Sequence, residues 1–562
     1  MLDDSEIDNF IKDRGILRGL NKDVGIASIT LIVIFVIYTI LMGDTASTQF
    51  LGAKKWIEET LGWYYIALMM LTFTVCFFIM FGRSGSIRLG KDDDRPEFSN
   101  FSWFSMLFAG GMGAGLLFFS MSEPLIHFAS QWHGGNPFLS GEVKAAVASF
   151  FEAKQQALAA GLKPGDEGFP VPNDLVANGA AGALKLTIFH WGTVAWGMYA
   201  VVGVSLAYFS FRKGLPLSIR SALYPLIGDK IYGFWGHLVD ILAVFGTIFG
   251  IATTLGLSVE QISSGLVSLG VIEAKSKTVT VVSIVIITAI ATFSATTGVA
   301  KGVKLLSSMN SWVCITIIAY FMLFSNFNYL IASTLTALGD YASEAISMTL
   351  WTARSPEERA WQGGWTIFYW GWWIAWAAFV GVFIARISKG RTIREFMLGV
   401  IFVPSVVALI WFGVIGSSAI YESIYGADMT LYNTAVNDWN YAGTLYQSFD
   451  VISPGIGAVL MKILTLFAMI IFFVTSADSG TLVLGRLLSF GRRPPTQQRI
   501  IWGFILGAVT LIVLLLGKEQ ALKALQAASI AGALPFSFVL VAMCWGLVKG
   551  IREELAENNK KS

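Results

Sequence analysis

Residues 109–119 read AGGMGAGLLFF and lie in the third of about twelve apolar stretches along the chain. Its glycines are Gly110, Gly111, Gly113 and Gly115. Each glycine inside a helix costs about 1 kcal/mol relative to alanine, so the stretch predicts a helix that breaks. A break at membrane depth is tolerated where it is buried in protein or lines a cavity. The alternative is close helix packing, since Gly111 and Gly115 have small-xxx-small spacing.

The composition indicates an all-α integral membrane protein. The 562 residues are 55% hydrophobic and 14% charged, with a mean hydropathy of +0.65, whereas soluble domains carry about 25% charged residues. The formal net charge of +2 argues against a nucleic-acid partner. Each stretch is near the ~20 residues that a transmembrane helix needs. The twelve predicted transmembrane helices are 24–42, 61–81, 101–122, 182–211, 235–257, 279–298, 305–327, 362–386, 396–417, 454–489, 499–516 and 524–549.

Basic residues follow every even-numbered span up to the tenth. They are Arg83 and Arg88, Arg212, Lys213 and Arg220, Lys301 and Lys304, Arg386, Lys389, Arg391 and Arg394, and Arg492, Arg493 and Arg499. The positive-inside rule places these loops and both termini in the cytoplasm of a cell that carries the protein in its plasma membrane. Segment 330–352 carries Asp340 and Glu344 among its apolar residues, so we expect an amphipathic helix at the outer surface.

Aromatic rings gather in two distant apolar segments, FHWGTVAWGMY (189–199) and YWGWWIAW (369–376). The rings are Trp191, Trp196, Tyr199, Trp372, Trp373 and Trp376. An indole face attracts a cation, more strongly once water is removed. Several faces together can therefore enclose a quaternary ammonium group, which has no hydrogen to donate. Aromatic side chains also fill cores and collect at membrane interfaces, which is the structural alternative for either group.

The tenth span contains FFVTSADSGT (472–481), a polar segment in an apolar helix. Thr475 and Ser476 lie beside Asp478 and supply oxygens, the ligands that hard cations such as sodium prefer. The hydroxyl of Ser479 can simply bond to the preceding helical turn. Asp478 is costly at membrane depth and needs a partner, which the sequence does not identify.

Other classes of membrane protein lack support in the sequence. A membrane-embedded enzyme should show clustered intramembrane His, Asp or Glu, but the four histidines look scattered, without ligand spacing. A channel should show a repeated filter or a ring of charges, and neither is evident. We therefore expect a carrier without an organic cofactor.

Five motifs in order make the chain resemble the betaine/choline/carnitine transporter (BCCT) family over nearly its whole length, and its sodium-coupled glycine betaine carriers above all. The motifs are GMGAGL at 111–116, SEP at 122–124, W-x4-W-x2-Y at 191–199, FYWGWWIAW with FIARISKGR at 368–391, and TSADS at 475–479. The resemblance implies a leucine-transporter-like fold with two inverted five-helix repeats, in a homotrimer surrounded by lipid. The implied parts are 1–100 with two peripheral helices, 101–327 as the first repeat, 328–360 as an extracellular surface helix, 361–549 as the second repeat, and 550–562 as a short cytoplasmic tail.

The same resemblance implies roles for individual residues. Trp191, Trp196, Tyr199 and Trp373 would form an aromatic cage, with Trp372 and Trp376 lining the pathway beside it. Amides around Met112, Gly113 and Ala114 would face a substrate carboxylate. The sodium ligands would be the backbone oxygens of Ala109, Met112 and Phe472 and the hydroxyls of Thr475 and Ser476.

One departure concerns a second sodium position. Betaine carriers use two threonines four residues apart in the fifth span; here Thr247 matches the first, but Ile251 stands at the second. Thr253 and Thr254 follow within a turn and would need a different geometry. Only half of that second site is therefore present.

These features predict a sodium-coupled importer of a zwitterionic quaternary ammonium solute, with glycine betaine first, for osmotic protection or nutrient uptake. Choline, dimethylsulfoniopropionate, ectoine and carnitine are the alternatives in the same site. Choline lacks a carboxylate, and a carrier adapted to it would gain from an acidic side chain near the break. Segment 109–119 contains no Asp or Glu, which favours a zwitterion.

Overall fold

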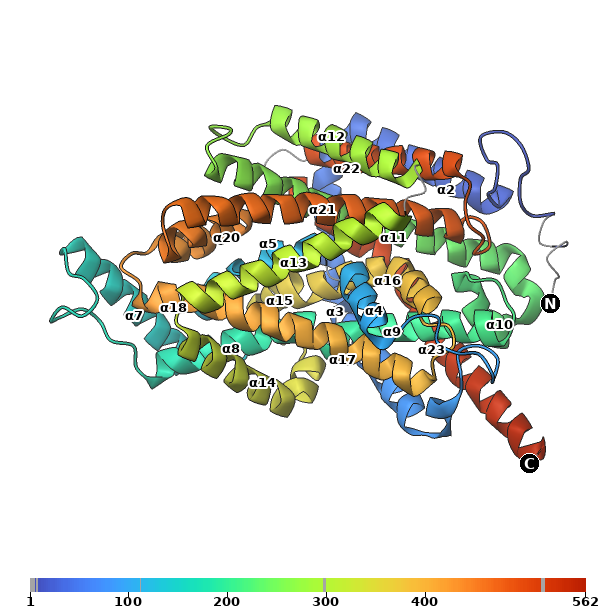
Figure 1. The fold of residues 1–562 in the computed structure, drawn as a ribbon, viewed down its shortest axis with the longest axis horizontal. Helices are drawn as coiled ribbons and strands as arrows, with labels where there is room; N and C mark the ends of the chain where they lie inside the picture. The colour runs from blue at the N-terminus through green and yellow to red at the C-terminus, as the bar shows by residue number, and fades with distance from the viewer. Residues whose placement is uncertain (1–5, 7–8, 112, 297–299, 517–520, 562) are drawn as a thin grey trace.

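Helices α9 Thr193–Ala207 and α16 Phe368–Ile387 pack against each other at the centre of the computed structural model and are almost completely buried (Figure 1). The structure describes residues 6, 9–111, 113–296, 300–516 and 521–561. The central helices are apolar on all sides because they contact protein on all sides. They therefore form a core whose surroundings are other helices and not lipid.

Long helices surround this core. They are α2 Lys22–Met42, α3 Asp44–Phe81, α8 Asp174–Trp191, α11 Phe234–Ser268, α12 Lys277–Thr296, α13 Ala300–Phe324, α14 Phe327–Leu350, α17 Ile393–Trp411, α21 Ile456–Leu487, α22 Thr496–Leu516 and α23 Ala521–Lys561. In Figure 1, α2, α12 and α22 lie along one edge and α14 along the opposite edge. Large apolar side chains such as Ile37 on α2 and Phe293 on α12 are exposed there. Such surfaces suit contact with lipid.

The glycine-rich third span is broken, as its sequence predicts. Helix α4 Asn100–Gly111 ends at the last of the paired glycines, and α5 Ala114–Phe119 begins after Gly113, whose backbone is extended (φ −119°, ψ −150°). Met112 lies outside the described residues. The short helix α6 Ser122–Ala129 follows.

The prediction of twelve spans is confirmed in part. Ten helices of the described residues are long and apolar enough to cross a membrane, and α13 with α14 forms an eleventh candidate that bends by 115°. The predicted span 101–122 is not among them, because the glycine break divides it into pieces of 12 and 6 residues. The helix predicted at 330–352 is present as α14, and it packs against α8. The division into inverted repeats and the trimer remain predictions.

The predicted span 182–211 is confirmed as a candidate span over Asp174–Arg212, but its helix is interrupted at Gly192, which the sequence pattern does not predict. Helix α8 ends at Trp191 and α9 begins at Thr193, with Gly192 in a non-helical conformation (φ −97°, ψ −149°). A Cβ atom at this position would lie 2.5 Å from the carbonyl oxygen of Ile188. Only glycine fits this approach, so the two halves of the span carry their aromatic residues on either side of an interruption in the helix.

Four of the loops predicted to be cytoplasmic, those after the second, fourth, eighth and tenth spans, meet at one end of the molecule. The Leu89 amide donates to the carbonyl of Arg391, and the Asn21 amide donates to the carbonyl of Leu488 (2.8 and 2.7 Å). Arg212 reaches across to Asp92 at 2.8 Å. The segment before α2 and the end of α23 therefore pack on the same side of the fold. That this side faces the cytoplasm remains the prediction of the positive-inside rule.

Glu554 fastens the end of α23 to the turn that follows α9. Its carboxylate accepts hydrogen bonds from the Tyr208 hydroxyl and pairs with the ammonium group of Lys213, each at 2.7 Å. The guanidinium of Arg212 contacts the other oxygen. Only 5% of the Glu554 surface is exposed, whereas the neighbouring Glu553 is exposed and lies 3.9 Å from Lys549.

We expect Glu554→Ala to lower the thermal stability of the detergent-solubilised protein. Removing one partner of a buried ion pair costs about 3–5 kcal/mol, and we expect about 2 kcal/mol here because Lys213 reaches water. The matched variant Glu553→Ala should leave the melting temperature within a degree or so, since exposed pairs contribute about 0–1 kcal/mol. Equal melting temperatures for both variants would show that the contacts of Glu554 contribute nothing to stability.

Candidate functional site

Four of the predicted cage rings meet at the centre of the fold. Trp191 ends α8, Trp196 and Tyr199 lie on α9, and Trp373 lies on α16. The ring centroids of Trp191 and Trp373 are 5.1 Å apart at 78°, those of Tyr199 and Trp373 6.2 Å apart, and those of Trp196 and Tyr199 5.5 Å apart. None of the four is more than 6% exposed. Below, these four rings are called the aromatic box.

The other two predicted rings lie beside the box. Trp372 stacks on Trp373 with centroids 5.0 Å apart and an interplanar angle of 11°. Trp376, one turn further along α16, packs against Phe379 at 5.0 Å. The indole nitrogens of Trp372 and Trp376 are buried without a hydrogen-bond partner among the described residues, and the Tyr199 hydroxyl is in the same situation. Three donors near the box are therefore available to a bound molecule.

The broken third span supports the box through Gly115. A Cβ atom at Gly115 would lie 2.6 Å from Cη2 of Trp372 and 3.0 Å from Cη2 of Trp191. Both indoles thus rest on the backbone of α5, where no larger residue fits. The glycines that weaken the helix therefore also allow two tryptophans to approach it.

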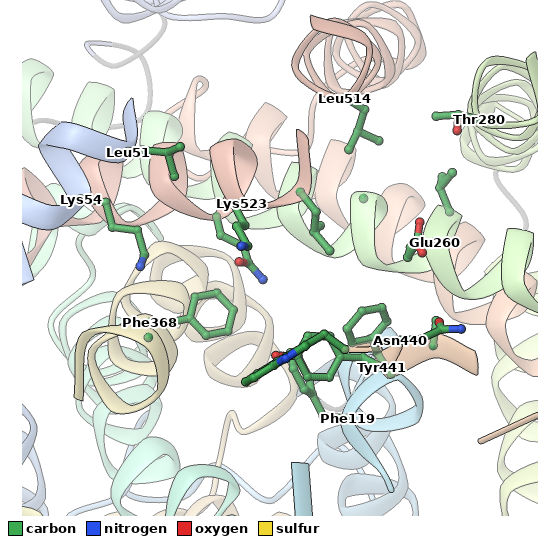
Figure 2. Close-up of a pocket in the computed structure, with 18 of the residues that line it drawn as sticks. Leu51, Lys54, Phe119, Glu260, Thr280, Phe368, Asn440, Tyr441, Leu514 and Lys523 are labelled. Carbon is green, nitrogen blue, oxygen red and sulfur yellow. The ribbon is translucent and has the colours of Figure 1, made fainter. Parts of the chain in front are cut away.

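A cavity of about 740 Å³ opens next to the box (Figure 2). Figure 2 shows Phe119, Phe368 and Tyr441 on one side of it, opposite Leu514 and Lys523. Phe368 stacks on Trp372 with centroids 5.7 Å apart, and Phe119 lies 6.2 Å from Trp191. Phe119 therefore lies between the cavity and Trp191, and Phe368 and Trp372 lie between the cavity and Trp373.

The predicted sodium ligands on α21 lie next to the break in the third span. A Cβ atom at Gly113 would lie 3.8 Å from the hydroxyl oxygen of Ser476. The Thr475 hydroxyl donates to the carbonyls of Ile471 and Phe472 at 2.8 and 3.2 Å. A hydroxyl that donates its proton keeps its lone pairs for a cation. Ala109 lies on α4, and Met112 is outside the described residues.

The polar residues predicted around a second sodium position differ in their bonding. The Thr247 hydroxyl on α11 is fully buried without a partner among the described residues. Thr253 donates to the carbonyls of Phe249 and Leu525 (2.9 and 3.2 Å), and Thr254 donates weakly within its own helix. Ile251 packs against Gly480 of α21. Of the three threonines, only Thr247 is thus free of hydrogen bonds within the described structure.

The structure identifies the partner of Asp478, which the sequence leaves open. The guanidinium of Arg499, on α22, donates to the Asp478 carboxylate at 2.7 Å, and both side chains are about nine-tenths buried. This ion pair satisfies the costly charge inside the protein, as expected for a carboxylate within a span.

A buried polar cluster corrects the expectation that the histidines are scattered. Glu123, His127 and His190 are completely buried, and their ligand-type atoms lie within 4.8 Å of one another. Trp191 of the aromatic box and Tyr369 of α16 donate to the same carboxylate. Glu123 and His127 are one helical turn apart in SEPLIH, a spacing visible in the sequence. His190 comes from another helix, so the cluster requires the fold.

Comparison with known proteins identifies the family of the chain. The sequence profile of the betaine/carnitine/choline family transporter matches residues 23–160 and 169–556. The chain belongs to this family. It is therefore a transporter and not an enzyme, and its substrates are of the betaine and choline type. The matched residues include both breaks and all four rings of the aromatic box.

Relatives within the family differ in the substrate that their names give. The chain is 40% identical over 533 residues to a glycine betaine transporter of Acinetobacter baylyi, covering 95% of this chain and 74% of that one. A glycine betaine/proline/choline/ectoine transporter of Vibrio parahaemolyticus is 37% identical (93% and 86% covered). The high-affinity choline transport protein of Escherichia coli is 36% identical (95% and 72% covered). A crystal structure of a manganese transporter from Eremococcus coleocola is 13% identical, covers 80% of this chain and 81% of its own, and gives a TM-score of 0.38, too low for a conclusion.

We expect Gly115→Ala to weaken substrate binding at least tenfold, because its methyl group would displace the Trp372 and Trp191 indoles. The matched variant is Gly52→Ala on α3, where an added Cβ meets nothing within 4 Å. That variant should keep full affinity and gain up to about 1 kcal/mol of stability. Radioligand binding to both purified proteins measures the difference. Unchanged affinity in Gly115→Ala would mean that these indoles do not hold the substrate.

Proposed function

We propose that the protein is a sodium-coupled importer of glycine betaine. The observation that carries the proposal is the aromatic box: four buried rings from three helices, with their faces turned at steep angles to one another. A trimethylammonium group offers no hydrogen-bond donor, so ring faces are the surface that can recognise it. Desolvated contacts of this kind contribute about 2 kcal/mol or more each.

The carboxylate end of the substrate would face the break in the third span. Helix α5 begins at Ala114, one residue before the glycine that Trp191 approaches, and amide groups at a helix start favour an anion. The unpaired Tyr199 hydroxyl and the Trp372 indole nitrogen are further donors nearby. This arrangement supports a zwitterion over choline, which has no carboxylate for these donors.

Sodium would bind on the other side of the same break. The hydroxyls of Thr475 and Ser476 and the carbonyl of Phe472 form a local oxygen set on α21 beside Gly113, the donor type that a hard cation takes. Because one interrupted helix would contact both ligands, sodium and betaine would favour each other's binding. A second sodium ion at Thr247 would need other oxygen ligands, because the side chain of Ile251, at the position of the second threonine, has no oxygen.

The predicted topology indicates to which side of the membrane the cavity opens. Lys54 and Lys277 line it and belong to segments expected near the outer surface. The cavity would then be the external approach to the box, with Phe119 and Phe368 between them. We propose that α14 forms subunit contacts in a homotrimer, because exposed apolar side chains follow its length. They are Phe327, Leu335, Leu338, Ile346 and Leu350.

Uptake by proteoliposomes tests the proposal directly. Labelled glycine betaine, choline, carnitine, ectoine and dimethylsulfoniopropionate are offered separately, with an inward sodium gradient and with potassium in its place. We expect betaine to accumulate with the sodium gradient only. Uptake of choline in preference to betaine would replace the substrate, and equal uptake in sodium and potassium would remove the coupling.

We expect Trp373→Ala and Trp196→Ala each to weaken betaine binding by roughly thirtyfold, which corresponds to ~2 kcal/mol for a desolvated cation–π contact. Trp373→Phe keeps a ring face and should retain more affinity than Trp373→Ala. Equilibrium binding to folded, purified variants provides the comparison. Both alanine variants binding betaine with unchanged affinity would exclude the aromatic box as the substrate site.

We expect the double variant Thr475→Ala with Ser476→Ala to raise the sodium concentration for half-maximal uptake at least tenfold, because two hydroxyl ligands are lost. The maximal rate at saturating sodium should fall less than the apparent sodium affinity. The matched control is Ser479→Ala, one turn along the same helix. A control variant that shifts the sodium requirement equally would argue against ligation by Thr475 and Ser476.

A further inference from the structure

The carboxylate of Glu123 on α6 is the centre of a network that spans three helices. Its Oε1 lies 3.3 Å from His127 Nε2 and 2.8 Å from His190 Nδ1. Its Oε2 accepts hydrogen bonds from the Trp191 indole nitrogen at 2.9 Å and from the Tyr369 hydroxyl at 2.5 Å. Glu123 is 0% exposed. Each oxygen therefore has two partners, and neither faces water.

This arrangement suits the ionised carboxylate. The indole N–H of Trp191 can only donate, and the Tyr369 hydroxyl donates to the same oxygen. Among the described residues, no Lys or Arg lies within ion-pair distance of Glu123. The negative charge is thus stabilised by hydrogen bonds and has no Lys or Arg beside it, and only protonation of His127 or His190 would place a positive charge next to it.

The charge reaches the aromatic box through Trp191. A hydrogen bond from an N–H to an ionised acceptor is strong, and it polarises the donor group. Electron density moves from the N–H toward the indole ring, which makes the ring face more negative. The attraction between a cation and a ring face is electrostatic and grows in a water-free site. A carboxylate behind Trp191 should therefore strengthen the hold of its face on an ammonium group.

A second wall of the box is tied to the same carboxylate. Tyr369 stacks on Trp373 with centroids 6.0 Å apart at 24°. The Trp373 indole nitrogen donates to the carbonyl of His190 at 3.2 Å, at the point where α8 ends. His190 in turn contacts Glu123. Glu123 therefore orients Trp191 directly, through a hydrogen bond, and orients Trp373 indirectly, through Tyr369 and His190.

We propose that Glu123 is the residue that makes the aromatic box selective for positive charge, acting through Trp191 without touching the substrate. The proposal rests on the proposed function, since it concerns the same site. In this role Glu123 is a positioning and specificity-determining residue. Removing the carboxylate charge of Glu123 should reduce the affinity for a quaternary ammonium group far more than the affinity for an uncharged group of the same shape.

The same cluster has the geometry to hold a metal ion, because ligand-type atoms of Glu123, His127 and His190 lie within 4.8 Å. A metal ion there would have to replace the hydrogen bonds that these atoms already make. Trp191 and Tyr369 would then lose their acceptor, or share it with the ion. The observed partners therefore favour the hydrogen-bonded network over a metal site.

The decisive experiment compares two ligands of one shape in Glu123→Gln. Glycine betaine carries a trimethylammonium group; tert-butylacetate has a carbon atom in place of the nitrogen and keeps the carboxylate. Glutamine has the volume of glutamate, and its amide can bond to a neutral imidazole that accepts. We expect betaine affinity to fall about tenfold and tert-butylacetate affinity to change less than about twofold. Glu123→Asp keeps the charge and should retain part of the selectivity.

Two further measurements separate the outcomes. The remote variant Glu554→Gln also removes a buried carboxylate but should weaken both ligands equally or neither. In a Trp191→Phe background, which lacks the indole N–H, Glu123→Gln should cost little additional betaine affinity. This cycle needs betaine alone, so it holds even where tert-butylacetate binds weakly.

An equal loss for both ligands in Glu123→Gln, or an undiminished loss in the Trp191→Phe background, would overturn the inference and leave Glu123 a purely structural role. Loss of betaine affinity on treating the unmodified protein with a metal chelator, restored by added metal, would also overturn it. Failure of the unmodified protein to bind betaine at all would instead overturn the proposed function.

Discussion

Inside a bilayer, a backbone group that leaves a helix must find another partner within the protein. The structure has two such interruptions near its centre, one between Gly111 and Ala114 and one at Gly192. At the second, the carbonyl of His190 is released from the helix and accepts a hydrogen bond from the Trp373 indole. The aromatic box thus depends on the breaks, because a broken helix supplies both the space for the rings and the acceptor that orients one of them.

The same constraint applies to charges, and the protein meets it in two ways. Asp478 pairs with Arg499, and Asp240 pairs with Arg220 at 2.7 Å, so each of these buried carboxylates has a cation beside it. Glu123 is satisfied by imidazole, indole and phenol groups instead. An ion pair suits a structural role because its field falls off quickly. Glu123 has no lysine or arginine beside it, and under the inference above its field would be directed at the aromatic box.

Local patterns in the sequence predicted much of the fold. The apolar stretches marked the helices, and the dense glycines of 109–119 marked the first break, because several helix-weakening residues together outweigh context. Gly192 was missed because a single glycine in an apolar run usually stays helical. The interruption there is visible only in the local backbone, where a Cβ atom would meet the carbonyl of Ile188 four residues earlier.

The site was predictable to a similar extent. Spacing indicated that Trp191, Trp196 and Tyr199 share a region, and the structure brings Trp373 from a helix about 180 residues later. The role of Glu123 could not be read in the same way. His127 lies one turn away, but His190, Trp191 and Tyr369 are 67, 68 and 246 residues distant. Tertiary structure alone decides which of the many polar residues in apolar segments meet.

Under the proposed function, two cations must be bound in one water-poor region without exchanging places. Sodium is small and strongly hydrated, and oxygen ligands at Thr475 and Ser476 would replace its water. A quaternary ammonium group is large and weakly hydrated, and ring faces suit it. A carboxylate in direct contact with the box would attract both ions. Placing Glu123 behind the Trp191 indole avoids that difficulty, because the ring passes on part of the charge as a negative face while offering sodium no oxygen. Selectivity between the two cations would then follow from where the negative charge is exposed, not from how much charge is present.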